Sequence, residues 1–207
     1  MSDLISGRYP QQHAFQGAVF GLAGNATTPS SAVRSNAEYL GLTGTAAAGL
    51  TNNKLTVVPV PVDNGVTYSQ VGFIAGSTAP TLTVNYAAIY SGQSVAANAT
   101  LLSQSANAGS TAPTISTVNV YTLSTPVTAN AVNAPYGYWY VGIQQSGTVN
   151  NCLTSAFGTA VNVFNSTIFP NAPFSLSATV ASTTGTAPTT LASPTTLAGL
   201  APIFFLQ

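Results

Sequence analysis

The stretch TLTVNYAAIY, residues Thr81–Tyr90, decides the fold class of this 207-residue chain. Every second residue in it is apolar, and a period of two is the pattern of a β-strand that turns one face toward a core. A Ser-Gly pair follows directly and ends the strand. The residues expected on the core face are Leu82, Val84, Tyr86, Ala88 and Tyr90.

Further strands are predicted on both sides of this stretch. Residues 55–62 are rich in β-branched side chains, and two prolines place this strand at an edge or a bend. The turn Asp63-Asn64-Gly65 joins it to the strand 66–75. Short strands between Gly, Pro and Asn turns indicate an all-β fold, an antiparallel, jelly-roll-like β-sandwich. The other predicted strands are 114–123 and 138–145, with weaker candidates at 100–104, 159–164, 174–181 and 203–206.

The first 50 residues differ in composition and predict an irregular arm with one short helix. Ser30 or Ser31 would cap that helix, which covers residues 32–40. Arg34 and Glu38 are four residues apart, so we expect them to pair across one turn on a solvated face. The flanking segment 43–51 is expected to be extended, with little local structure.

We therefore expect three parts: an anchoring arm over 1–50, a β-sandwich domain over 51–181, and a terminal part over 182–207. The terminal part begins with low-complexity sequence at 182–200, which is typical of a long surface loop. It ends in a run too apolar to be left in water. That run is either a last core strand or a tail that docks on a neighbouring subunit.

All charged side chains lie within the first 63 residues, and the formal net charge is zero. Acid–base catalysis, most metal sites and nucleic-acid binding depend on residue types that the rest of the chain lacks. A Ser-His-Asp set could be written only with His13 and either Asp3 or Asp63, and no nucleophile motif flanks them. We therefore expect no enzyme, no metal or cofactor and no nucleic-acid partner. No apolar run approaches the ~18 residues of a spanning helix, so membrane insertion is not expected either.

An aromatic cluster, PYGYWY at residues 135–140, is the candidate contact site. In a strand, Trp139 would face the core together with Val141 and Ile143, whereas Tyr138 and Tyr140 would face the other way. Two interpretations stay open. The tyrosines pack at a sheet surface or protein interface, or they stack on sugar rings while amides bind hydroxyl groups. The residues concerned are Tyr136, Tyr138, Tyr140 and Gln144.

A chain with 3% charged residues lacks the repulsion that keeps protein molecules apart, which favours a homo-oligomer. The charged side chains that could make polar contacts with a partner are then concentrated in the arm, which would anchor the protein to a larger structure. The candidate anchoring residues are Arg8, His13, Phe15, Arg34 and Glu38.

Residues 81–147 resemble a β-sandwich module of virion proteins from tailed phages of actinobacterial hosts. The resemblance covers about a third of the chain and rests on four segments in order: AIYSG at 88–92, LLSQS at 101–105, VYTL at 120–123 and YWYVGI at 138–143. It implies a capsid decoration, minor capsid or minor tail protein on the particle surface, in contact with other capsid or tail proteins. By analogy with virion spikes it also suggests a trimer. The alternative is a tail-associated carbohydrate-binding module that recognises a host-surface glycan; head or tail location stays open.

Overall fold

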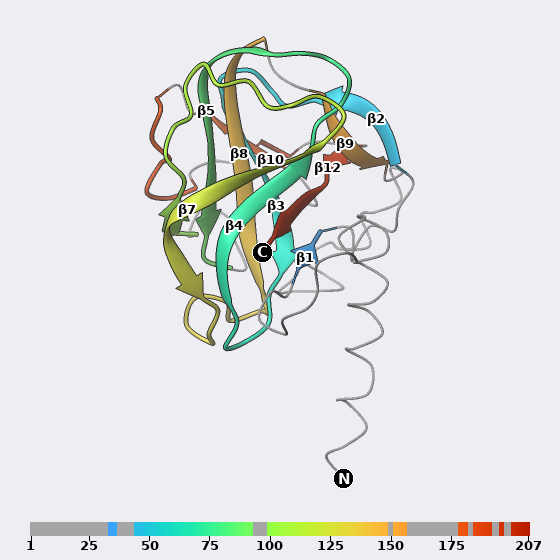
Figure 1. Ribbon diagram of the computed structural model, residues 1–207. Helices are drawn as coiled ribbons and strands as arrows, with labels where there is room; N and C mark the ends of the chain where they lie inside the picture. Colours follow the sequence, from blue (N-terminus) through green and yellow to red (C-terminus); the bar gives the residue numbers. More distant parts are fainter. Residues whose placement is uncertain are drawn as a thin grey trace.

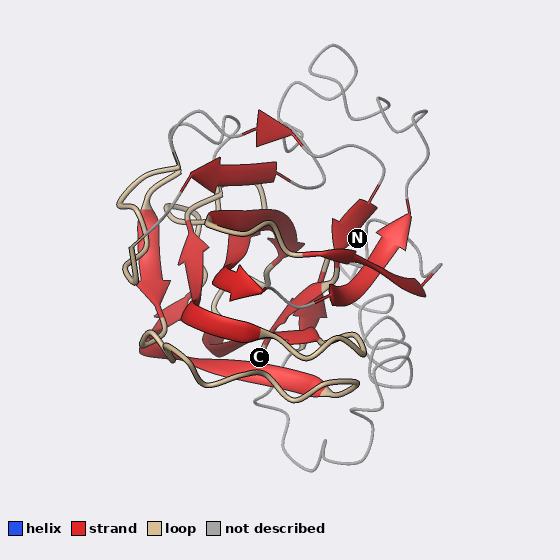
Figure 2. Cartoon of the chain, turned by 90° about the horizontal axis from the view of Figure 1, so that it is seen from above, coloured by secondary structure: helices blue, strands red, loops and turns tan. Residues whose placement is uncertain are grey.

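The computed structural model describes residues 33–36, 44–92, 99–148, 151–156, 178–181, 184–191, 195–196 and 200–207. These residues form strands, turns and loops, and none of them is helical (Figure 2). They build two facing sheets in which neighbouring strands are antiparallel, with a small third sheet beside them (Figure 1).

The first sheet has the strand order β1 (Arg34–Ser35), β13 (Phe204–Leu206), β4 (Thr67–Ile74) and β7 (Val118–Thr128). The second has the order β11 (Thr195–Thr196), β10 (Ala178–Ala181), β3 (Lys54–Pro61), β8 (Tyr138–Thr148), β5 (Thr81–Tyr90) and β6 (Leu101–Gln104). The third consists of β12 (Leu200–Pro202), β9 (Asn151–Ala156) and β2 (Gly44–Gly49).

Eight of these strands form a jelly roll. Along the chain β3 lies in the second sheet, β4 in the first, β5 and β6 in the second, β7 in the first and β8 in the second, while β1 and β13 join the first sheet. Within each sheet, strands from the first half of this eight-strand series (β1, β3, β4, β5) alternate with strands from its second half (β6, β7, β8, β13), which is the wrapped topology of a double-sheet jelly roll. The predicted jelly-roll-like sandwich is confirmed, and β10 and β11 extend the second sheet beyond β3.

The main core lies between the two sheets. Trp139 on β8 is fully buried and meets the ring of Tyr68 on β4 edge-on, with 5.6 Å between the ring centroids. Val141 and Ile143 belong to the same core, as their alternation predicted. From the first sheet, Phe73 and Phe204 complete it.

The second sheet is also buried on its other face, which carries a second apolar cluster. Tyr86, Ala88 and Tyr90 from β5 point into it, whereas Ala87 and Ile89 of the same strand belong to the main core. The predicted face of β5 is therefore confirmed, but the strand has two buried faces rather than one. The other members of this outer cluster are Leu55, Val57, Ala99, Tyr138, Tyr140, Ala187 and Leu191.

Part of the cover on that face comes from residues 184–191. Tyr90 donates a hydrogen bond to the carbonyl of Pro188 at 3.0 Å, and Leu191 N–H donates to Ala99 at 3.0 Å. Ala187 and Leu191 are buried. This segment is a loop, as predicted for 182–200, and four of its threonines are exposed, but its buried Ala187 and Leu191 pack against the sheet.

Three details of the predicted strands need correction. The strand predicted at an edge or a bend, β3, is an inner strand of its sheet. Its two prolines lie beyond Val57, where the described pairing with β10 ends. The turn at Gly65, which has a positive φ of 84°, does not close a hairpin, since β3 and β4 belong to different sheets. The strand expected from residue 114 begins at Val118, because residues 115–117 form a turn.

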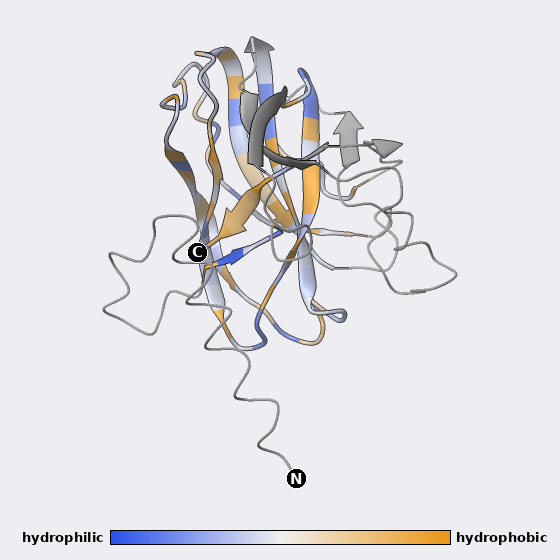
Figure 3. Cartoon of the chain, turned by 90° about the vertical axis from the view of Figure 1, so that its right-hand side faces the viewer, coloured by the Kyte–Doolittle hydropathy of each residue, from blue (hydrophilic) through white to orange (hydrophobic). Residues whose placement is uncertain are grey.

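The two ends of the described chain meet in the first sheet. Arg34–Ser35 is a strand that pairs with β13, so the helix predicted over 32–40 is wrong at these two residues; residues 37–40 lie outside the described residues. The apolar C-terminal run is a core strand, since β13 sits between β1 and β4. Figure 3 shows this apolar strand beside the polar β1. The extended segment expected at 43–51 contains β2, which pairs with β9.

Candidate functional site

The structure brings the three predicted tyrosines together but leaves only one of them accessible. Tyr136 is 41% exposed, whereas Tyr138 and Tyr140 are 2% and 1% exposed. Tyr136 stacks on Tyr138 with 6.3 Å between ring centroids, and Tyr138 meets Tyr140 edge-on at 5.4 Å. The row therefore runs from the outer cluster of the second sheet to the protein surface.

Gln144, the amide predicted to bind sugar hydroxyls, is buried on β8. Its Oε1 accepts a hydrogen bond of 2.5 Å from the hydroxyl of Tyr86. Burial also raises the pKa of Tyr90 and of Tyr140 far above the ordinary value of 10, so both hydroxyls are neutral at physiological pH. Tyr138, Tyr140 and Gln144 thus belong to the packed interior, and Tyr136 is the member of the predicted set that can touch a ligand.

Tyr136 belongs to a loop, residues 129–137, that two asparagines hold in shape. The Oδ1 of Asn130 accepts the backbone N–H groups of Val132 and Asn133, at 2.9 and 3.0 Å. In return, the Oδ1 of Asn133 accepts the N–H of Asn130 at 3.0 Å and the indole N–H of Trp139 at 3.2 Å. The loop is thereby fixed to the main core through the Trp139 ring, and the asparagines act as turn formers.

Between this loop and the turn after β3 lies a hollow of about 200 Å³. Backbone hydrogen bonds join the two walls: Gly65 N–H donates to Ala129 at 2.7 Å, and Val62 N–H donates to Gly137 at 2.9 Å. The lining is largely apolar, with two amides. It consists of Val62, Asn64, Asn130, Ala131, Ala134, Pro135 and Gly137.

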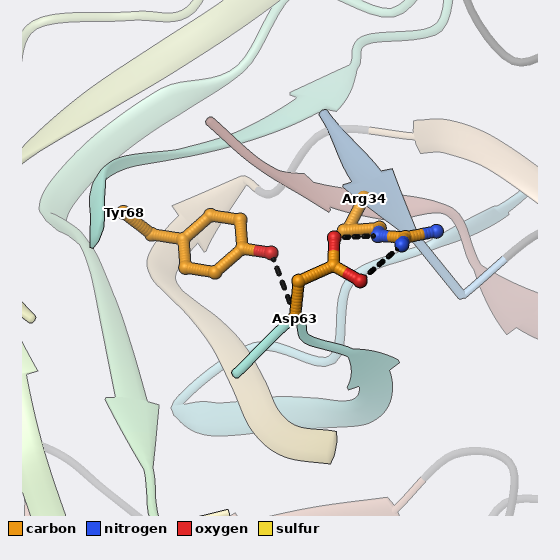
Figure 4. A network of polar contacts seen from close by, with 3 residues as sticks. All are labelled: Arg34, Asp63 and Tyr68. Carbon is orange, nitrogen blue, oxygen red and sulfur yellow. Dashed lines mark hydrogen bonds and ion pairs between the residues drawn. The ribbon is translucent and has the colours of Figure 1, made fainter. Parts of the chain in front are cut away.

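An ion pair supports the β3 side of this hollow (Figure 4). The Nε of Arg34 donates to one carboxylate oxygen of Asp63 at 2.7 Å, and its second nitrogen contacts the other, so the pair is bidentate. The Arg34 side chain is 4% exposed and that of Asp63 is 29% exposed. The backbone N–H of Asp63 also donates to the Tyr68 hydroxyl at 3.1 Å, and burial raises the pKa of that hydroxyl above 10.

This ion pair corrects the expectation for Arg34. The residue does not lie on a solvated helix face; it lies on β1, buried, and forms an ion pair with a carboxylate 29 residues away. Arg34 therefore helps to build the sandwich and has no free charge to offer a partner. The other candidate anchoring residues, Arg8, His13, Phe15 and Glu38, lie outside the described residues.

The sequence indicated Tyr136 but missed the hollow beside it. Its walls come from two loops about 70 residues apart, and only the jelly-roll topology brings them together. The repeated asparagines at 130 and 133 were the available signal, because Asn followed closely by Ala and Pro is typical of a structured turn. An uncharged hollow of this kind can contact a neutral partner through van der Waals packing and amide hydrogen bonds.

No group of three His, Cys, Asp or Glu side chains within the described residues could hold a metal ion. Nor is there, in the part of the chain that the structure describes, a helix long and apolar enough to cross a membrane. Compared with known proteins, the chain matches no family model and none of the curated proteins.

Proposed function

We propose that this chain is a non-enzymatic structural protein of a tailed-phage particle, of the capsid decoration or minor capsid type. The observation that carries the proposal is a jelly roll with an almost neutral exterior. Of the three charged residues among those described, Arg34 and Asp63 neutralise each other, which leaves Lys54. Such a surface lets many copies pack closely without mutual repulsion.

Two further points support a place on a virion. Double-sheet jelly rolls are a common architecture of viral capsid domains. The resemblance of residues 81–147 to phage virion modules falls on β5, β6, β7 and β8, four strands of that jelly roll. Both points favour a role in assembly over a role in catalysis.

In this proposal residues N-terminal to the sandwich attach the protein to the particle surface. The test is a deletion of residues 2–32, which stops just before the first described contact and leaves β1 and the Arg34–Asp63 pair in place. We expect the truncated protein to fold, as measured by circular dichroism and thermal unfolding. It should no longer co-sediment with particles from which the native protein is missing.

A control variant, Lys54→Ala, removes the remaining described charge without touching the N-terminal residues. It should sediment with particles like the full chain. Full attachment of the truncated protein would disprove anchoring by these residues. If the full chain itself never co-sediments with particles, the virion assignment fails.

A tail-associated carbohydrate-binding module is the second candidate, favoured by the exposed ring of Tyr136 beside the largely apolar hollow, whose lining includes the amides of Asn64 and Asn130. Saccharides bind to aromatic faces and to amide groups, and both are present here without any charge. Tyr136→Ala should abolish binding on a glycan array, while Val132→Ala on the same loop should preserve it. An array with no signal for the full chain would reject this candidate.

A further inference from the structure

We propose that the outer edge of β7, with which no described strand pairs, pairs with β7 of a second copy, so that two chains form a dimer around a twofold axis. The inference concerns the sandwich itself and does not depend on where the protein resides. It starts from the ends of the two main sheets. Among the described strands, β7 is the last strand of the first sheet, and it lies at the outside of the fold (Figure 1).

The backbone of β7 has groups available for such pairing. Ala75 N–H donates to the carbonyl of Thr117 at 3.0 Å, and the same antiparallel register continues to Thr122 opposite Gln70. In an antiparallel ladder, alternate residues bond to one neighbour and the residues between them face the other way. The N–H and C=O groups of Val118, Val120 and Thr122 therefore point to the edge, where no described strand pairs with them.

The available stretch is short and well bounded. On its C-terminal side the stretch ends where β7 approaches β6. There Leu123 bridges Ser105, and the N–H of Thr125 donates to Ser103 Oγ at 3.3 Å. At its N-terminal end the side chain of Asn119 folds back and accepts the N–H of Thr114 at 2.8 Å. Residues 118–122 remain, and this stretch can pair antiparallel with the same stretch of a second copy.

The side chains at this edge are apolar and exposed. Val118 and Val120 are 39% and 43% exposed, and Ile115 in the preceding turn is 42% exposed. Natural edge strands are usually protected by lysine, proline or a covering loop. Residues 118–122 carry no charge and no proline, so this edge lacks the protection that lysine or proline gives.

A second copy is the partner that fits. With Val120 on the axis, Val118 of one chain lies opposite Thr122 of the other, and no charges meet. Val120 also continues a row in which Gly72 and then Phe205 are its cross-strand neighbours. The Phe205 ring lies over Gly72, where an added Cβ would come within 2.2 Å of its Cζ. Across the axis the two rows join into one apolar band.

The other sheet ends explain why such pairing would stop at two chains. The opposite edge of the first sheet is β1, which has two residues, and the edges of the second sheet are β11 and β6, with two and four. The available stretch of β7, residues 118–122, is longer than each of these edges, so within these two sheets its best-matched partner is the same stretch of a second copy. When the same edge of two copies pairs, the interface is isologous and closes as a dimer. Pairing between two different edges would instead continue from chain to chain and form fibres.

The test measures mass and backbone protection of the full chain. Multi-angle light scattering at high concentration should give twice the 20.9 kDa of one chain and should fall toward 20.9 kDa on dilution. Hydrogen exchange of peptides covering residues 118–122 should be slower at high concentration, without a matching change in the loop 129–137. A single-chain mass at every concentration, a trimer mass, or unchanged exchange at 118–122 would overturn the proposal.

Two variants examine the same edge in different ways. Val120→Lys adds a charge that would face its own copy across the axis. Val120→Pro removes an N–H that points to the edge and leaves the ladder to β4 intact. Both should give the single-chain mass with an unchanged circular dichroism spectrum. Val132→Lys, at an 85% exposed position on another loop, should still dimerise. A dimer that persists in a folded Val120→Lys variant contradicts pairing through this edge.

Discussion

At the scale of single residues, the partly buried pair of Arg34 and Asp63 shows how this chain uses its few charges. A buried charge is tolerated only when it is paired and hydrogen-bonded, and the bidentate geometry satisfies both groups. We predict that Asp63→Ala lowers the free energy of unfolding by about 3 kcal/mol, because it removes the carboxylate that binds the buried Arg34 guanidinium in bidentate fashion. Urea unfolding followed by tryptophan fluorescence measures the loss, since Trp139 lies in the main core.

The double variant Arg34→Met, Asp63→Ala is the informative control. It removes both charges, so it should be more stable than Asp63→Ala alone. Equal or greater destabilisation in the double variant would show that Asp63 acts through something other than its charge. Lys54→Ala, which has no described ion pair, should change stability by less than about 0.5 kcal/mol.

The same pair marks a limit of prediction from sequence. Local spacing favoured Glu38 as the partner of Arg34, because four residues bring side chains together on a helix. The partner that the structure describes, Asp63, follows β3, and β1 is a strand because β13 from the far end of the chain pairs with it. A two-residue strand has no periodicity of its own, so nothing within 32–40 could have indicated it. The alternation that identified β5 and the core side of β8 was, in contrast, contained in those strands.

At the scale of elements, β13 shows the same dependence on distant partners. Its residues are apolar enough to predict a strand, but the choice between a core strand and a docking tail needed the sheet order. Likewise, the hollow beside Tyr136 could not be predicted, since it needs two loops that the topology brings together. The turn at Gly65 was predicted correctly from its residues, whereas its role as a link between sheets depends on the whole jelly roll.

We predict that Phe204→Ala destabilises the protein by about 3–5 kcal/mol, because it opens a cavity in the centre of the main core. Thermal unfolding of the variant should show a much lower midpoint than that of the full chain. Gln207→Ala is the matched control at the chain end: its backbone bonds to Ser69 and Gln70 remain, and its side chain is only partly buried. A core strand requires the first variant to be far more damaging than the second, whereas a detachable tail would make them alike.

At the scale of the whole molecule, buried tyrosines couple stability to pH. Burial raises the pKa of Tyr121 to about 12, and it raises the pKa values of Tyr68, Tyr90, Tyr138 and Tyr140 in the same direction. These residues come from both sheets and from both apolar clusters. Their hydroxyls stay protonated in the folded chain at a pH where those of the unfolded chain ionise. The unfolded state is therefore favoured as the pH rises above 10.

Tyr121 gives the sharpest form of this prediction. Its contribution is complete below the ordinary pKa of 10 and is lost between pH 10 and about 12, a difference of roughly 2–3 kcal/mol. The free energy of unfolding of Tyr121→Phe should therefore fall less steeply as the pH rises. The variant starts from a lower stability, because it loses the hydrogen bond of 2.5 Å to Asn85. Urea midpoints measured at a series of pH values from neutral to 12 give this slope. Thr122→Ser, the exposed neighbour on β7, should keep the slope of the unaltered chain. If the slope for Tyr121→Phe equals that of the unaltered chain, Tyr121 is not among the groups that make this fold sensitive to alkali.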